Sequence, residues 1–82
     1  MKPVLRLGFT DSFPTLDTFF IETLSKIFDI QRDDDNPQVL IFCDENFGNN
    51  NRKYDDRNVI KVFYTGENRR SQNYHCHFVL KQ

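Results

Sequence analysis

The sequence predicts an α/β fold in which one open, mainly parallel sheet of four or five strands is flanked by helices. Three observations support this prediction. Residues 39–42 are apolar without alternation, as is typical of a strand covered on both faces, and residues 59–64 form a second strong strand. Residues 15–28 carry apolar side chains at helical spacing. Because strands and helices alternate along the chain, parallel strands with crossover connections are favoured.

The first strand is predicted at residues 4–9. Leu5, Leu7 and Phe9 lie on one face of this loosely alternating segment. A loop at residues 10–14 follows it.

A helix is predicted after this loop. Thr15 can cap its N-terminus, and Asp17 in the first turn is favoured by the helix dipole. The helix should end near Phe28. Its apolar stripe comprises Leu16, Phe19, Phe20, Leu24, Ile27 and Phe28.

The remaining segments complete an order typical of a single Rossmann-like domain. Residues 29–31 predict a short edge strand, and residues 32–36, with three consecutive aspartates, predict a polar turn. The triplet lacks the alternating oxygen ligands of a calcium-binding EF-hand loop. Residues 44–58 are expected to form a loop or a short helix. Residues 67–74 are polar, and residues 77–80 predict a last short strand.

The composition excludes several classes of protein. Eleven basic and twelve acidic residues give a net charge of −1, which argues against nucleic acid as a partner. The pair Arg69 and Arg70 could contact an anion or could simply be solvated. No apolar run is long enough for a membrane span, and residues 1–3 lead directly into a strand without a signal peptide, so a cytoplasmic location is expected. Cys43 and Cys76 are predicted to be buried free thiols.

The main candidate for chemistry is Glu67, which follows Gly66 at the predicted C-terminal tip of a strand. Open α/β sheets bind their ligands at this edge. Glu67 could act as a general base toward a hydroxyl group, or it could be a solvated turn carboxylate. Phe13 and Pro14 should lie at the same edge, where Phe13 could stack on a sugar ring or anchor the start of the helix.

The run His75-Cys76-His77 raises the possibility of a metal site to which Cys43 might contribute. A third or fourth ligand at a defined spacing is missing, so we expect no metal and interpret these residues as packing groups. The three glycines form no phosphate-binding motif. We therefore expect no cofactor in this chain.

Several segments together resemble the N-terminal domain of the bacterial-type α-1,3/4-fucosyltransferases. The specific match is Val62-Phe63-Tyr64-Thr65-Gly66-Glu67-Asn68. Weaker matches in the same order are Leu24-Ser25-Lys26, Phe28-Asp29, Asp35-Asn36-Pro37, Phe47-Gly48 and Lys53-Tyr54. Cys76 also fits, whereas Ser71 and the pair His77-Phe78 replace a proline and an Asp-Tyr pair of the family pattern.

The resemblance implies an inverting transferase with the two-domain GT-B fold that uses GDP-fucose. The N-terminal domain of this family mainly binds the acceptor, commonly an N-acetyllactosamine-type saccharide. Glu67 corresponds to the proposed general base. Asp11, Phe13, Asn68 and Arg70 are candidates for acceptor contacts or for the cleft that faces the second domain.

The resemblance also implies that the GDP-fucose donor binds a C-terminal domain that these 82 residues lack. We therefore expect no transferase activity from the chain alone, and the full-length enzyme could be membrane-peripheral. A second hypothesis is a stand-alone, non-catalytic module that binds a protein partner or a glycan.

Overall fold

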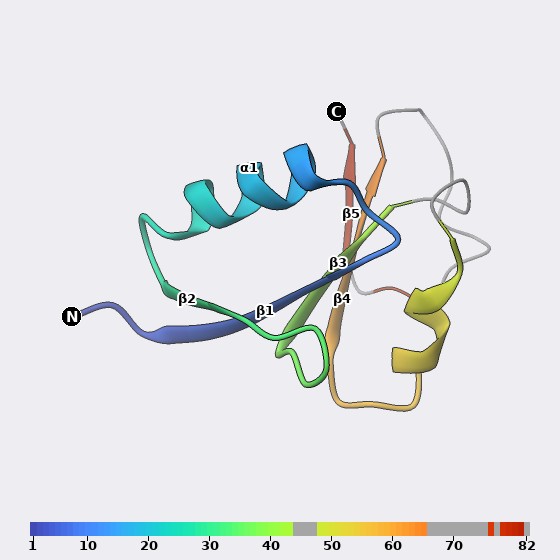
Figure 1. The fold of residues 1–82 in the computed structure, drawn as a ribbon. Coiled ribbons are helices and arrows are strands. Elements are labelled where there is room, and N and C mark those ends of the chain that lie inside the picture. The colour runs from blue at the N-terminus through green and yellow to red at the C-terminus, as the bar shows by residue number, and fades with distance from the viewer. Residues whose placement is uncertain (44–47, 66–75, 77, 82) are drawn as a thin grey trace.

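The computed structural model describes residues 1–43, 48–65, 76 and 78–81. Five strands form one sheet in the order β2-β1-β3-β4-β5, and every pairing of neighbouring strands is parallel (Figure 1). The predicted open α/β sheet is therefore confirmed. The elements are β1 (Val4–Thr10), α1 (Pro14–Leu24), β2 (Asp29–Arg32), β3 (Val39–Phe42), the 3-10 helix η2 (Asn50–Tyr54), β4 (Ile60–Thr65) and β5 (Phe78–Lys81).

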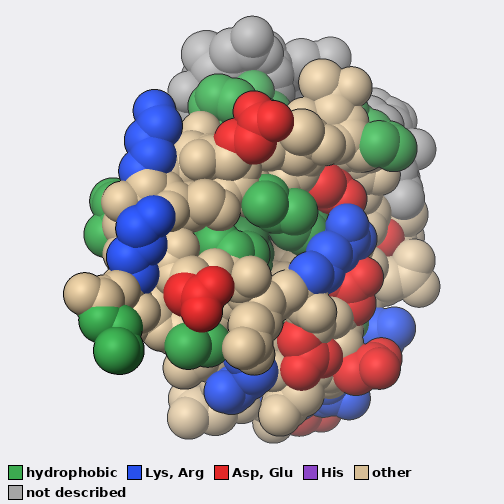
Figure 2. All heavy atoms as spheres, turned by 60° about the vertical axis from the view of Figure 1, so that its left-hand side comes forward, with side chains coloured by type: hydrophobic (Ala, Val, Ile, Leu, Met, Phe, Trp, Pro, Cys, Tyr) green, Lys and Arg blue, Asp and Glu red, His purple; other side chains and the backbone are tan. Residues whose placement is uncertain are grey.

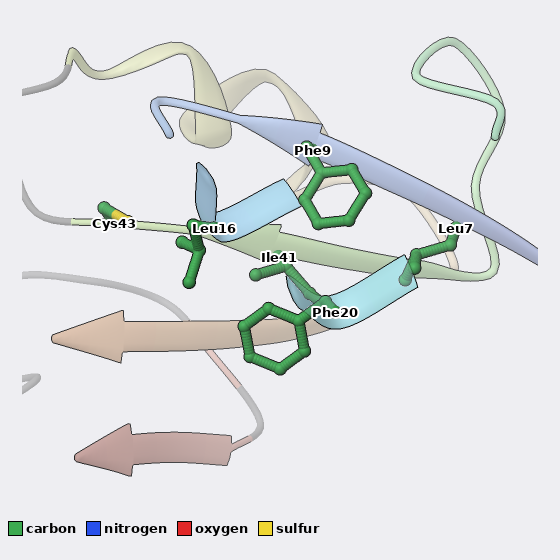
Figure 3. Packing of buried hydrophobic residues seen from close by; sticks show 6 residues of the cluster. All are labelled: Leu7, Phe9, Leu16, Phe20, Ile41 and Cys43. Atoms are coloured by element: carbon green, nitrogen blue, oxygen red, sulfur yellow. The ribbon is translucent and has the colours of Figure 1, made fainter. Parts of the chain in front are cut away.

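Helix α1 covers one face of the sheet and builds the main hydrophobic core there. Leu16 and Phe20 of the helix pack against side chains from β1, β3 and the residue after β3 (Figure 3). The buried members of this core are Leu7, Phe9, Leu16, Phe20, Ile41 and Cys43. In the described part of the chain, neither cysteine forms a disulfide; Cys43 is buried, as predicted, whereas Cys76 is only partly buried.

The opposite face is covered by the segment that connects β3 to β4. Tyr54 and Val59 from this segment form a second buried cluster with Leu40. Phe42 and Phe63, on neighbouring strands, are fully buried with ring centroids 5.4 Å apart. Helix α1 covers one side of β3 and the β3–β4 connection covers the other, which explains why β3 is apolar on both sides.

The connection from β2 to β3 is unusually short for two parallel strands. Strand β2 pairs with residues 4–7 of β1, and β3 pairs with residues 7–10 on the other side of β1. Because the two strands are offset along β1, the chain only has to cross β1 once and needs no return helix. The crossing occurs at Gly8, where a Cβ atom would lie 2.9 Å from the carbonyl oxygen of Asp33 and 2.9 Å from Cβ of Pro37.

Asp34 completes this crossing with its side chain. One carboxylate oxygen accepts a hydrogen bond of 3.1 Å from the backbone N–H of Phe9. Phe9 lies two residues beyond Leu7, the last residue of β1 that pairs with β2. The backbone N–H groups of Asp33 and Gln38 donate to the carbonyls of Leu7 and Arg6 on the two sides of the crossing. Asp33 and Asp34 thus continue the hydrogen bonding of β2 along β1 after β2 has ended.

Helix α1 differs from its prediction at both ends. The N-cap residue is Phe13 rather than Thr15, because Pro14 occupies the first turn and needs no N–H partner there. The helix ends at Leu24 and not near Phe28. The chain uses residues 25–28 to turn back into the sheet, where the N–H of Asp29 donates to the carbonyl of Pro3.

The predicted apolar stripe of the helix is also partly wrong. Phe19 and Ile27 are 57% and 62% exposed. Phe19 lies on the outer side of α1, and Ile27 lies beyond the helix end. Leu16 and Phe20 are buried, and Ile21 and Leu24 are partly buried against the same core.

The predicted edge strand after the helix and the short helix within residues 44–58 are both confirmed, as β2 and η2. Within the described part of the chain, no helix combines the length and apolar character needed to cross a membrane.

Candidate functional site at the carboxyl edge of the sheet

The strand order places a topological switch point between β1 and β3. Helix α1 follows β1 on one face, whereas the segment after β3 covers the opposite face (Figure 1). In parallel α/β sheets, ligands bind outside the carboxyl ends of the strands where the crossovers diverge in this way. We call this region the carboxyl edge. It comprises Asp11, which follows β1, Cys43, which follows β3, and Thr65, which is the last residue of β4.

Asp11 is buried at the centre of this edge, with 7% of its surface exposed. One carboxylate oxygen accepts hydrogen bonds of 3.0 Å from the backbone N–H and from the side-chain amide of Asn50. The other accepts bonds of 2.8 and 2.9 Å from the same two groups of Asn51. The backbone carbonyl of Asp11 accepts a bond from the N–H of Cys43. Asp11 thus joins the ends of β1 and β3 to η2.

The backbone around Asp11 is held in uncommon conformations. Asp11 has a φ of 52°, the left-handed region that aspartate tolerates better than most residues. Gly48 has a φ of 123°, and a Cβ atom there would lie 2.7 Å from Oδ1 of Asp11. Only glycine fits this position, both for its backbone and for the space beside the carboxylate.

A fully buried lysine extends the cluster to β4. The Lys61 ammonium donates to Oδ1 of Asn51 at 3.0 Å and to Oδ1 of Asp55 at 2.5 Å. It also lies 4.9 Å from the centroid of the Phe42 ring. Asn51 is fully buried between Lys61 and Asp11, so its carbonyl faces the cation and its NH₂ group faces the carboxylate.

Neither Asn51 nor Lys61 was predicted from the sequence to belong to this site. The sequence does contain a signal for Lys61. This lysine lies inside the apolar run 59–64, and burial of a charged side chain is energetically costly unless it has a charged or hydrogen-bonding partner.

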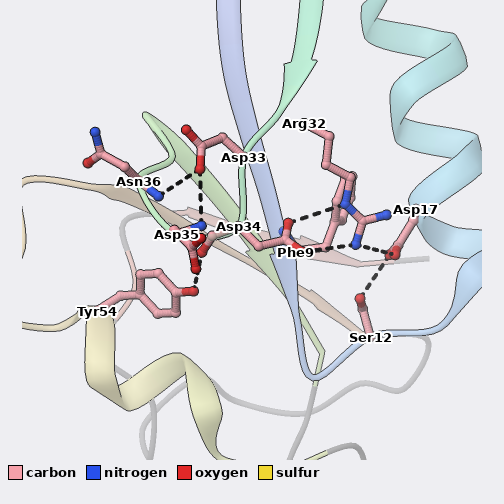
Figure 4. Close-up of polar contacts among 9 residues, drawn as sticks. All are labelled: Phe9, Ser12, Asp17, Arg32, Asp33, Asp34, Asp35, Asn36 and Tyr54. Carbon is pink, nitrogen blue, oxygen red and sulfur yellow. Dashed lines mark hydrogen bonds and ion pairs between the residues drawn. The ribbon is translucent and has the colours of Figure 1, made fainter.

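A second polar network lies beside the start of α1 (Figure 4). Ser12 donates to Asp17 at 2.8 Å, and the Arg32 guanidinium forms ion pairs with Asp17 at 3.4 Å and with Asp34 at 3.2 Å. Arg32 also lies 5.0 Å from the centroid of the Phe9 ring. The hydrogen bond to Asp34 is the main reason that the pKa of Arg32 is raised. These contacts join the loop after β1 to β2.

Tyr54 connects η2 to the crossing segment. Its hydroxyl donates to the carbonyl of Asp34 (Figure 4). The cations of Lys53 and Arg57 contact its ring. Burial raises the pKa of the Tyr54 hydroxyl above its usual 10.0, and the negative charge of Asp34 adds to this effect.

Phe13 lies at the carboxyl edge, as predicted, and is partly buried against the main core. Its carbonyl accepts hydrogen bonds from the N–H groups of Leu16 and Asp17. The structure therefore gives Phe13 the anchoring role that was one of its two interpretations, while part of its side chain remains accessible.

The other predicted site residues fall outside the part of the chain that the structure describes. They are Glu67, Asn68, Arg70, His75 and His77. Glu67 follows Thr65, the last residue of β4, by two positions in the sequence.

The aspartate triplet builds a turn. Oδ1 of Asp33 accepts hydrogen bonds from the backbone N–H groups of Asp35 and Asn36. Across residues 1–43, 48–65, 76 and 78–81, no group of three or more His, Cys, Asp or Glu side chains is placed to hold a metal ion. On the face shown in Figure 2, acidic and basic side chains are interspersed around a few exposed hydrophobic ones.

Comparison with known proteins assigns the chain to a family. No curated protein and no solved structure matches it. Residues 5–81 match the family model described as "Alpha-(1,3)-fucosyltransferase FucT N-terminal domain". The match runs from β1 to the end of β5 and includes the carboxyl edge. The chain therefore belongs to the FucT N-terminal domain family of α-(1,3)-fucosyltransferases.

Proposed function

We propose that this chain is the acceptor-binding half of an inverting fucosyltransferase that transfers L-fucose from GDP-fucose to an N-acetyllactosamine-type glycan. The observation that carries the proposal is the family match over residues 5–81, which includes the tip after β4. The carboxyl edge supports it, because the ends of β1, β3 and β4 meet where α/β sheets bind ligands.

Glu67 is the general base of the proposed reaction. It accepts the proton of the acceptor hydroxyl as that oxygen attacks the anomeric carbon of fucose. The new bond forms on the face opposite to the departing GDP, so the configuration inverts. Removal of the proton in the transition state typically contributes about 10²–10⁴-fold to the rate.

The other predicted residues take supporting roles. Asn68 and Arg70 follow Glu67 in the sequence, and we propose that they contact the acceptor or line the cleft toward the second domain. Phe13 offers the accessible part of its ring at the same edge. In this proposal the donor, with its diphosphate, binds a C-terminal domain of the GT-B fold, so residues 1–82 alone are not expected to catalyse transfer.

The test is Glu67→Gln in the complete two-domain enzyme. We expect kcat to fall by about two orders of magnitude or more, because glutamine cannot accept the proton. The matched control is Glu22→Gln, the same chemical change at an exposed position of α1. Near-normal turnover of Glu67→Gln would remove Glu67 from the mechanism.

Titration of the chain with N-acetyllactosamine, followed by NMR, tests acceptor binding separately. We expect shifts at residues 10–14 and 66–70. No shift at millimolar sugar would contradict acceptor binding and would favour a module that binds a protein partner.

A further inference from the structure

We propose that Asp11 is a positioning residue of the acceptor site, and that it acts through a buried chain of contacts from Asp11 to Asn51 to Lys61. This inference rests on the proposed function. It differs from the direct acceptor contact that the sequence suggested for Asp11. We call these three residues the clamp.

The hydrogen bonds of Asp11 leave its carboxylate little capacity for a sugar. An ionised carboxylate offers about four acceptor positions. The N–H and NH₂ groups of Asn50 and Asn51 provide four donors at 2.8–3.0 Å. With 7% of its surface exposed, Asp11 faces the protein and not the solvent.

The clamp joins the parts of the chain that form the carboxyl edge. Asp11 follows the end of β1, and its backbone carbonyl receives the N–H of Cys43 at the end of β3. Asn51 belongs to the connection between β3 and β4, and Lys61 belongs to β4 itself. The clamp therefore ties the ends of β1 and β3 to Lys61, the second residue of β4, through one buried set of charges and amides.

The clamp is also directional. The amide of Asn51 donates to a carboxylate on one side and accepts from an ammonium on the other. An interior of low polarity strengthens both contacts and penalises any arrangement that leaves one of these groups unpaired. The edge is thus held in one arrangement before any ligand binds.

Positioning of this kind affects binding and rate, since a displacement of about 1 Å can cost roughly 10²-fold in an enzyme reaction. A shift of the strand ends should weaken the acceptor site. It should leave the donor site on the other domain unchanged. The Michaelis constants for the two substrates therefore report on the clamp.

The experiment is a double-mutant cycle in the complete enzyme with Asp11→Asn, Asn51→Asp and the two changes combined. Asp11→Asn places an NH₂ group against the donors of Asn50 or Asn51. Asn51→Asp places a second carboxylate 2.9 Å from the first. The combined exchange restores an amide–carboxylate pair in the reverse sense and gives Lys61 a second anionic partner besides Asp55.

We expect each single variant to raise KM for the acceptor by about tenfold, with KM for GDP-fucose unchanged. Independent changes would multiply to about 100-fold in the combined variant. The clamp predicts a loss no greater than that of either single variant. All variants are measured well below their melting temperatures, so that loss of folded protein does not contribute.

Two results would overturn the inference. If Asn51→Asp has no effect and Asp11→Asn is not rescued by the exchange, Asp11 contacts the acceptor directly. If the melting temperature falls while KM for the acceptor stays constant, the cluster serves stability alone.

A readout without turnover separates this inference from the proposed function. The side-chain amide protons of Asn51 should exchange slowly with solvent in the wild-type chain and rapidly in Asp11→Asn. If the wild-type enzyme transfers no fucose, the proposed function fails, and this exchange measurement still decides whether the clamp exists. Slow exchange in both proteins would refute it.

Discussion

Replacement of Lys61 by methionine tests the energetic role of the buried cation. The change removes the ammonium and keeps a side chain of similar length beside Phe42. It takes away the donor to Oδ1 of Asn51 at 3.0 Å and the partner of Asp55 at 2.5 Å. Because Asn51 is fully buried, its carbonyl oxygen cannot turn to water instead.

The expected loss of stability follows from these contacts. A buried acceptor without a donor costs about 1–3 kcal/mol, and loss of the contact between the cation and the Phe42 ring costs roughly 0.5–2 kcal/mol. The side chain of Asp55 is 35% exposed, so water replaces part of its ion pair. Removal of a buried charge offsets some of the loss. We expect a net destabilisation of about 2–3 kcal/mol, a large fraction of the ~4–12 kcal/mol typical of a domain of this size.

Urea denaturation of the chain measures this value. With a slope of about 1–1.5 kcal/mol per molar urea, the midpoint should fall by roughly 2 M. Lys26→Met, the same change at an exposed position, is the matched control and should leave the midpoint within about 0.5 M. A Lys61→Met chain as stable as the wild type would refute the reasoning, since it would show that Asn51 does not depend on the cation.

Two further predictions concern the crossing segment. Gly8→Ala should destabilise the chain by about 2 kcal/mol or more in the same assay, because its Cβ would lie 2.9 Å from both Asp33 and Pro37; an unchanged midpoint would contradict the crossing. The phenol of Tyr54 should ionise above pH 10, followed by ultraviolet absorbance with Tyr54→Phe as the reference. Since the pKa is raised in the folded state, the stability contribution is complete below pH 10.0 and is lost as the pH rises through the higher folded pKa. A Tyr54 signal that titrates at or below pH 10 would contradict the burial of its hydroxyl.

The positions of the strands could be predicted from local patterns. Residues 39–42 are apolar on both faces because both faces are covered, and this information lies within four consecutive residues. The candidate base could be found for the same reason. Glu67 follows Gly66 at the end of a strand pattern, and the surrounding run carries the family resemblance by itself.

The end of helix α1 could not be predicted in this way. Phe28 and Ile27 continue the helical spacing, but the chain must reach the pairing of Asp29 with Val4 at the start of β2. That pairing stabilises the strand at the expense of the last helical turn. Phe19 is exposed because only one side of helix α1 packs against the sheet. The apolar spacing in the sequence does not indicate how wide this packed side is.

The sequence by itself determined an open parallel α/β sheet and a carboxylate after β4, because both depend on residues that are neighbours along the chain. Only the tertiary structure decided that Asp11 holds Asn51 and that Asn51 holds Lys61. The first contact joins residues separated by 40 positions, and the second joins residues separated by 10. Both contacts depend on the crossing of β1 at Gly8, which sets β3 beside β1 and β4 beside β3, since hydrogen bonds act over about 3 Å and leave no periodic trace in the sequence.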